Sequence, residues 1–245
     1  MKIFELDIDT YENSQLLENS GVEANLWVNG DTVFKILRAN YREKLREKCI
    51  EEMTELSHPN CVFPDAKLVW DDTKSFIGVK ERYLKDYITL SKYLNNNKID
   101  FKTRKQIAYK MCEIMDYLHS IDLRYIDIHA SNVMTNGKDI QLIDMDAAEF
   151  KKYHAKSDYF DYMREDMICT YLSELCFSIL LNHDLDVRSI VNDSDIVKLI
   201  KKSNKSQKDF IEKVFERKEE LIRVSDYIDH FDEDYMEESR LILHI

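Results

Sequence analysis

Residues 127–144 read Asp127-Ile-His-Ala-Ser-Asn132-Val-Met-Thr-Asn136-Gly137-Lys-Asp-Ile-Gln-Leu-Ile-Asp144. The Asn-Gly pair separates two apolar runs, and a two-residue loop of this kind predicts a β-hairpin that ends at Asp144. Asp127, Asn132 and Asp144 therefore fall on one short loop and hairpin. Two carboxylates and an amide offer oxygen ligands that suit Mg²⁺, which usually completes its coordination shell with substrate phosphates.

The first third of the chain carries mainly strand signals. A second Asn-Gly loop, at 29–30, lies between apolar runs and places Lys35 on a strand. The helical period of the apolar residues predicts one amphipathic helix over 41–56. Strand-like runs follow over 66–70 and 75–83.

The remainder of the chain carries mainly helix signals. A long helix with one apolar face is predicted over 101–121. Residues 167–181 are apolar on nearly all sides, which predicts a buried central helix, and everything after Asp166 reads as helical. Strands in one part and helices around a single hairpin in the other predict an α+β fold in two lobes.

The order of these features resembles the protein kinase-like superfamily. In that family an Asp-x-x-x-x-Asn loop precedes a hairpin that a metal-binding aspartate closes. The resemblance implies that Asp127 is the catalytic aspartate and that Asn132 and Asp144 hold Mg²⁺. It also implies a small, mainly antiparallel N-lobe over 1–83 and a mainly helical C-lobe over 84–245.

The same resemblance implies an ATP site in the N-lobe. Lys35 stands where the family has its phosphate-binding strand lysine, and it counts as a catalytic residue for that reason. Residues 19–26, with Gly21 and Leu26, fall where a glycine-rich loop covers the phosphates, although only the middle glycine of the motif is present. The carbonyl of Glu81 and the amide of Tyr83 are expected to meet the adenine edge.

The family also needs a helix glutamate that pairs with the lysine. Glu52 flanks the apolar stripe of the first helix and is the favoured candidate, with Glu51 and Glu47 as alternatives. Counting back from His58-Pro59, however, places Cys49 where the glutamate is expected.

Several positions depart from the family pattern. Tyr125-Ile126 replaces the usual His-Arg, Asp146 replaces the glycine after the metal-binding aspartate, and Asp166 follows Asp144 by only 22 positions. His129 is expected either to contact a phosphate or to have a structural role. The acceptor is therefore left open between a protein Ser/Thr hydroxyl, a small molecule of the aminoglycoside or choline type, and none at all in a pseudokinase that serves as a nucleotide-binding scaffold.

A competing motif lies near the N-terminus. Residues 4–10 resemble the start of a haloacid dehalogenase-type phosphatase, with Asp7 and Asp9 as the acidic pair. Glu5 interrupts the apolar strand that those enzymes need, and Tyr11 takes the position after Thr10. This alternative is weaker than the kinase-like one.

Composition narrows the classes of partner. The 245 residues include 35 Lys plus Arg and 47 Asp plus Glu, for a net charge of −12. An acidic chain repels a phosphate backbone, so nucleic acid is not an expected partner. No apolar window is long enough to span a membrane, and the first residues lack the pattern of a signal peptide, so a cytoplasmic location is expected. The five cysteines are widely spread and are expected to be reduced core thiols.

Overall fold

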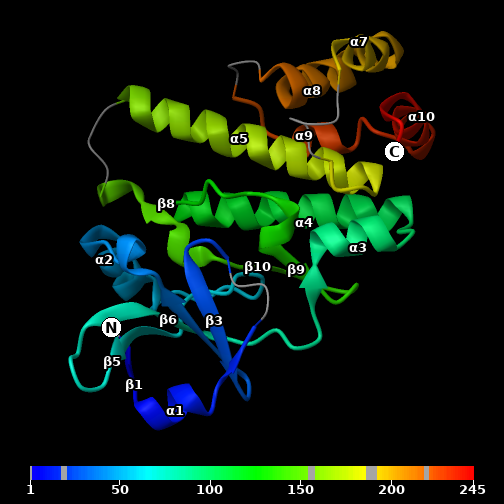
Figure 1. The fold of residues 1–245 in the computed structure, drawn as a ribbon. Coiled ribbons are helices and arrows are strands. Elements are labelled where there is room, and N and C mark those ends of the chain that lie inside the picture. The colour runs from blue at the N-terminus through cyan, green and yellow to red at the C-terminus, as the bar shows by residue number, and fades with distance from the viewer. Residues whose placement is uncertain (1, 18–20, 154–157, 186–191, 218–220) are drawn as a thin grey trace. The chain divides into compact units, whose positions relative to one another are not determined.

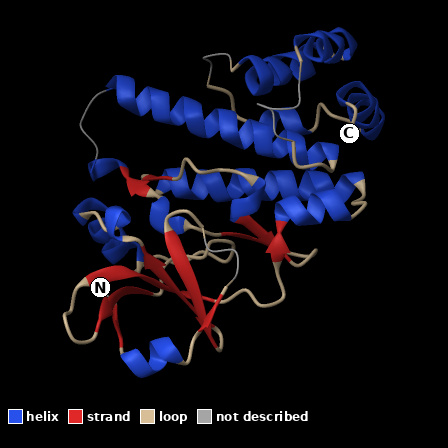
Figure 2. Cartoon of the chain, in the orientation of Figure 1, coloured by secondary structure: helices blue, strands red, loops and turns tan. Residues whose placement is uncertain are grey.

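The computed structural model describes residues 2–17, 21–153, 158–185, 192–217 and 221–245. The chain divides into two compact units, residues 1–87 with 141–153 and residues 88–140 with 154–245. A mainly antiparallel sheet and a set of helices are both present, which confirms the α+β class (Figure 2). The kinase-like arrangement and the lobe boundary between residues 83 and 84 stay predictions.

The first unit is built on a six-stranded sheet of order β1-β5-β6-β4-β3-β2. The pairs are antiparallel except at the edge, where β1 runs parallel to β5. This edge strand was not predicted, because its four residues include a charged one and give a weak pattern. The strands are β1 (Ile3–Leu6), β2 (Gln15–Leu16), β3 (Ala24–Asn29), β4 (Thr32–Leu37), β5 (Ala66–Trp70) and β6 (Phe76–Arg82).

The register of this sheet places two lysines on one face. Lys35 of β4 lies opposite Val79 of β6, and Val79 lies opposite Lys67 of β5. Directly paired residues share a face of a sheet, and so do residues two apart on one strand. Lys35, Lys67 and Glu81 therefore point to the same side.

Helix α2 (Lys44–Met53) packs against β5 and β6, burying Cys49, Ile50 and Met53. It is shorter than the predicted 41–56, because η1 (Ala39–Tyr41) forms a separate 3-10 turn before it. At its other end the hydroxyl of Thr54 donates to the carbonyl of Glu51, 2.8 Å away.

Aromatic and aliphatic side chains fill the opposite face of the sheet. Leu6, Phe34, Leu68 and Ile77 form its buried centre. Helix α1 (Ile8–Glu12) adds Tyr11, whose ring centroid lies 4.6 Å from that of Trp27.

The acidic motif at the N-terminus has a structural use here. The carboxylate of Asp7 accepts hydrogen bonds from the backbone nitrogen of Thr10 at 2.7 Å and from its hydroxyl at 2.9 Å. This is the N-cap arrangement that stabilises the first turn of a helix. The motif is therefore accounted for without phosphatase chemistry.

The second unit is mainly helical (Figure 1). Helix α5 packs against α4, α8 and α10, and all of its residues from 175 to 181 are buried, which confirms the predicted buried central helix. The helix begins at Asp158, so Asp166 lies within it and does not open it as expected. The helices are α3 (Leu90–Asn96), α4 (Phe101–Ser120), α5 (Asp158–Leu181), α7 (Asp193–Lys202), α8 (Lys205–Glu216), α9 (Ser225–Ile228) and α10 (Glu233–Leu243).

Short elements surround the predicted catalytic stretch. In the second unit β7 (Ile88–Thr89) pairs antiparallel with β9 (Val133–Thr135). Gly137 of the Asn-Gly turn after β9 has a positive φ, as Gly30 has in the first unit. The chain passes from the second unit into the first within β10 (Ile140–Leu142). The other short elements are β8 (Leu123–Arg124), η2 (Ala130–Asn132), η3 (Met145–Ala147), β11 (Glu149–Phe150) and η4 (Lys151–Tyr153). None of the helices within the described ranges is both long enough and apolar enough to cross a lipid bilayer.

Gly78 on β6 occupies a position that admits no side chain. Its φ is +154°, and a Cβ atom there would lie 1.9 Å from the carbonyl oxygen of Lys35. We expect Gly78→Ala to lower the free energy of unfolding by about 3 kcal/mol or more, because backbone must move to remove the clash. Urea denaturation followed by circular dichroism measures this.

Gly21→Ala is the matched control, since a Cβ atom at Gly21 meets nothing within 4 Å. Its free energy of unfolding should stay within about 0.5 kcal/mol of the wild type. Equal stability of the two variants would contradict the packing described for β4 and β6.

Candidate functional site

Lys35 is the centre of a buried charge cluster in the first unit. Its side chain is 6% exposed, and its Nζ atom lies 2.6 Å from Asp146 Oδ1 and 3.1 Å from Asp144 Oδ1. Burial alone would lower the pKa of Lys35, but Asp146, Asp144 and Glu81 outweigh it and raise that pKa above its ordinary value. The group is therefore an ammonium ion at neutral pH.

Asp144 joins this cluster from the residue before η3. Its backbone is left-handed, with φ 60° and ψ 30°, a conformation that aspartate and asparagine tolerate better than most residues. Its side chain is 40% exposed, so the carboxylate holds Lys35 with one oxygen and still reaches the surface of the unit.

Asp146 lies deeper and divides its two oxygens between two cations. Its side chain is fully buried; Oδ1 accepts from Lys35, and Oδ2 accepts from Arg46 Nη2 at 2.7 Å. Burial would raise the pKa of Asp146, but Lys35 and Arg46 lower it below its ordinary value. Sequence reasoning noted Asp146 only as a missing glycine, although a second acidic residue beside Asp144 and the absence of a glutamate at position 49 were signals of its role.

Arg46 extends the cluster to the segment before β3. Its Nη1 atom donates to Glu23 Oε2 at 2.7 Å, so one guanidinium bridges two carboxylates. Arg46 and Cys49 lie three residues apart on α2, and both line a cavity of about 180 Å³ together with Asp146. Helix α2 thus contributes a cation to the cluster, whereas a carboxylate had been expected from this helix.

The expected pairing of Lys35 with a glutamate of α2 is not the one observed. Glu52 contacts Lys152 and the hydroxyl of Tyr153. Its two alternatives, Glu47 and Glu51, both bind Lys67, at 2.9 and 2.6 Å. These three carboxylates form ion pairs with Lys67 or Lys152, and Asp146 is the buried carboxylate that binds Lys35.

Glu81 adds a buried carboxyl group to the same face of the sheet. Its Oε1 atom has no hydrogen-bond partner among the described residues. Burial and the nearby charge of Asp146 raise the pKa of Glu81 to about 8, against the opposing effect of Lys35. The residue lies within β6, opposite Val33, and the adenine contact expected of its carbonyl stays a prediction.

The predicted adenine contact of Tyr83 stays a prediction, and the amide concerned has a backbone partner within the first unit. The Tyr83 amide donates to the carbonyl of Asp31 at 2.8 Å and so closes the ladder between β4 and β6. Leu26 of β3 lies opposite Lys35, on its face of the sheet, whereas Gly21 precedes the strand. Residues 18–20 of the predicted nucleotide loop lie outside the described residues.

The second unit contains the predicted catalytic loop. Asn132 lies at the end of η2, and its Nδ2 atom donates to Asp127 Oδ2 at 2.8 Å and to the hydroxyl of the buried Tyr125 at 3.0 Å. His129 Nε2 lies 3.4 Å from Asp127 Oδ1. These contacts orient Asn132 by its nitrogen, which leaves its amide oxygen as the atom suited to a cation.

The donor set of Asn132 and Asp144 fits Mg²⁺ in its chemistry, since both supply hard oxygen ligands. Asn132 belongs to the second unit and Asp144 to the first. Within the part of the chain that the structure describes, no group of three or more histidine, cysteine or acidic side chains is placed to hold a metal ion by itself. A bound ion would therefore depend on an amide and on phosphate oxygens as further ligands.

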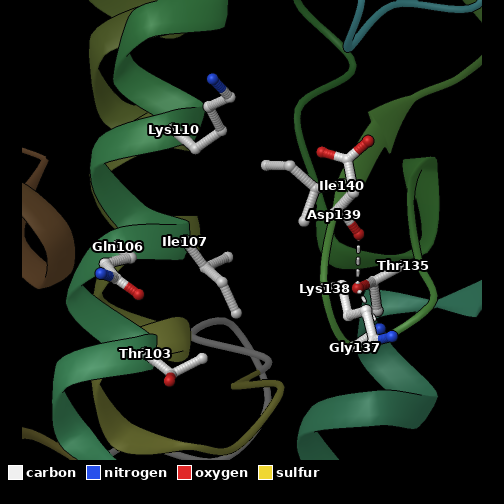
Figure 3. Close-up of a pocket in the computed structure, with 9 residues that line it drawn as sticks. All are labelled: Thr103, Gln106, Ile107, Lys110, Thr135, Gly137, Lys138, Asp139 and Ile140. Carbon is white, nitrogen blue, oxygen red and sulfur yellow. Dashed lines mark hydrogen bonds between the residues drawn. The ribbon is translucent and has the colours of Figure 1, made fainter.

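A larger cavity of about 230 Å³ lies elsewhere in the second unit, between α4 and the segment from β9 to β10 (Figure 3). Ile107 and Lys110 face it from the helix, and Thr135 and Ile140 from the other side. None of the predicted site residues lines it. Cavity size alone therefore does not identify the functional site.

Comparison with known proteins gives a partial relationship. No family model matches the chain. A segment of 94 residues is 29% identical to a putative serine/threonine-protein kinase of Acanthamoeba polyphaga mimivirus. The match covers 38% of this chain and 16% of that relative. Part of the chain thus resembles a protein described as a kinase.

The raised pKa of Glu81 predicts stability that falls as the pH rises. Between about 4.5 and about 8 the folded protein keeps a proton that the unfolded chain releases. The contribution is fully present below pH 4.5 and is lost as the pH rises through 8. We expect Glu81→Gln to remove this fall and to be more stable than the wild type at about pH 8, by on the order of a few kcal/mol.

Urea denaturation of both proteins from about pH 5 to about pH 9 measures the difference, and subtraction removes the titration of all other groups. A constant difference in unfolding free energy across this range would show that the Glu81 carboxyl group does not have a raised pKa.

Proposed function

We propose that the protein is an ATP- and Mg²⁺-dependent phosphotransferase that transfers the γ-phosphate of ATP to a protein serine or threonine hydroxyl. The observation that carries the proposal is the Lys35 ammonium, buried on a sheet and held 3.1 Å from the partly exposed carboxylate of Asp144. A cation beside a carboxylate that can bind a metal ion suits the binding of a polyphosphate together with its Mg²⁺ ion. The partial relationship to a putative kinase supports the same class.

The roles follow from what phosphoryl transfer requires. Charge on the phosphates must be neutralised and the acceptor hydroxyl must be oriented, since there is little covalent chemistry for the protein to perform. Lys35 neutralises phosphate, and Asp144 and Asn132 hold Mg²⁺, which when bound supplies further neutralisation. Asp127 orients the hydroxyl and accepts its proton, and its contact with Asn132 fixes the direction of its carboxylate.

A small-molecule acceptor of the aminoglycoside or choline type is the second candidate. The imidazole ring of His129 lies beside the proposed proton acceptor, with its Nε2 atom 3.4 Å from Asp127 Oδ1. The short stretch between Asp144 and Asp166 also leaves little chain with which to bind a peptide. A pseudokinase would bind ATP without transferring phosphate.

We expect purified protein with γ-labelled ATP and Mg²⁺ to label itself or a generic protein substrate. Asp127→Asn and Asp144→Asn should each lower the rate by at least about 100-fold, because each removes a charge needed in the transition state. Asparagine is chosen at 144 because it tolerates the left-handed backbone there. Melting temperatures serve as the folding control.

Labelling that persists in both variants would reject the assigned roles. Transfer to a small alcohol but not to protein would favour the second candidate. A thermal shift with ATP but no transfer would favour the pseudokinase, because a ligand that binds only the folded state stabilises it.

A further inference from the structure

We propose that Asp146 and Arg46 are positioning residues for Lys35, so that helix α2 acts on this lysine through an arginine and a buried aspartate. The inference rests on the phosphate-binding role that the proposed function gives to Lys35. It concerns a carboxylate that lies two residues after the proposed metal ligand and an arginine on the helix.

The first step concerns which carboxylate holds Lys35 in place. Asp146 is fully buried and 2.6 Å from the Lys35 Nζ atom, whereas Asp144 is 40% exposed and 3.1 Å away. Water and salt weaken ion pairs at exposed groups far more than at buried ones. Asp146 therefore fixes the ammonium, and Asp144 keeps an oxygen available for a ligand.

The second step concerns what fixes Asp146. Its two oxygens have separate partners, Lys35 and Arg46, each at charge-assisted hydrogen-bond distance. Any rotation of the carboxylate would break one of these strong bonds in a site that water does not reach. The direction in which Lys35 points therefore depends on Arg46.

The third step concerns the elements that Arg46 connects. Arg46 lies on α2, and its other nitrogen binds Glu23, two residues after Gly21. A continuous chain of ion pairs thus runs from the segment before β3, through α2 and η3, to β4. Movement of α2 along or away from the sheet would pull Arg46 from Asp146 and release Lys35.

Lys67 provides an internal control for this chain. It lies on the same face of the sheet, is nearly as buried as Lys35, and binds Glu51 at the same distance of 2.6 Å. The carboxylates of Glu51 and Asp146 bind different cations, so loss of one of them should free one lysine only. General loosening of the unit would expose both lysines.

The test measures the acylation rate of each lysine by an amine-directed reagent, read by peptide mass spectrometry. We expect Asp146→Asn and Arg46→Met to raise the acylation rate at Lys35 by at least about threefold relative to Lys67. The loss of a hydrogen bond to a charged group typically shifts an equilibrium by more than this factor. Glu51→Gln should raise the rate at Lys67 instead. In the double variant Arg46→Met should add nothing to the effect of Asp146→Asn, since it acts through the aspartate.

Arg46→Met carries the test alone if Asp146→Asn does not fold, because Arg46 is partly exposed and its loss keeps the Asp146 carboxylate in the cluster while removing the contact that fixes its direction. Equal rises at Lys35 and Lys67, or no rise at Lys35, would overturn the inference. So would additive effects in the double variant.

Phosphate transfer separates this inference from the proposed function. We expect Asp146→Asn and Arg46→Met to lower the transfer rate in the wild-type background but not the residual rate of Lys35→Met, since both act through Lys35. Wild-type transfer with unchanged Lys35 acylation in the variants would leave the proposed function standing and overturn the inference. Absence of both transfer and ATP binding in the wild type would overturn the proposed function itself, whatever the acylation pattern.

Discussion

The first unit depends on how one buried ammonium ion is neutralised. Lys35 lies on the second strand of a hairpin, with its side chain inside the unit and not at its surface. A buried charge without a partner is strongly destabilising, and breaking a buried pair typically costs about 3 to 5 kcal/mol. The carboxylates of Asp146 and Asp144 meet this requirement, whereas Glu81, which burial keeps protonated up to about pH 8, adds no charge at neutral pH.

This requirement explains several features that look unrelated in the sequence. The segment 144–153 folds with the sheet unit, far from it along the chain, because it brings Asp144 and Asp146 to Lys35. Arg46 then balances the second oxygen of Asp146 and connects it to α2. The left-handed backbone at Asp144 points one carboxylate outward and lets the next acidic residue turn inward.

Local patterns in the sequence predicted the local structure well. The turn at Asn29-Gly30 placed Lys35 on its strand, and the period of apolar residues gave α4 almost to the residue. The partners of Lys35 could not be found in this way, because ion pairs across a hundred residues leave no periodic signal. The position of Glu52 on a helical wheel favoured it as the partner of Lys35, yet its carboxylate accepts from Lys152 and Tyr153. The roles of Asp127, Asn132 and His129 stay predictions. These three residues belong to the second unit, whereas Lys35 and Asp144 belong to the first.

The most direct test of the central claim follows the Lys35 side chain itself. Nuclear magnetic resonance of ¹⁵N-labelled lysine side chains reports the ammonium signal of Lys35, with Lys67 as an internal reference. Addition of Mg²⁺ and a non-hydrolysable ATP analogue should move the Lys35 signal and leave that of Lys67 in place. A Lys35 signal that does not move at saturating analogue would contradict the claim that this ammonium faces the phosphates of a bound nucleotide.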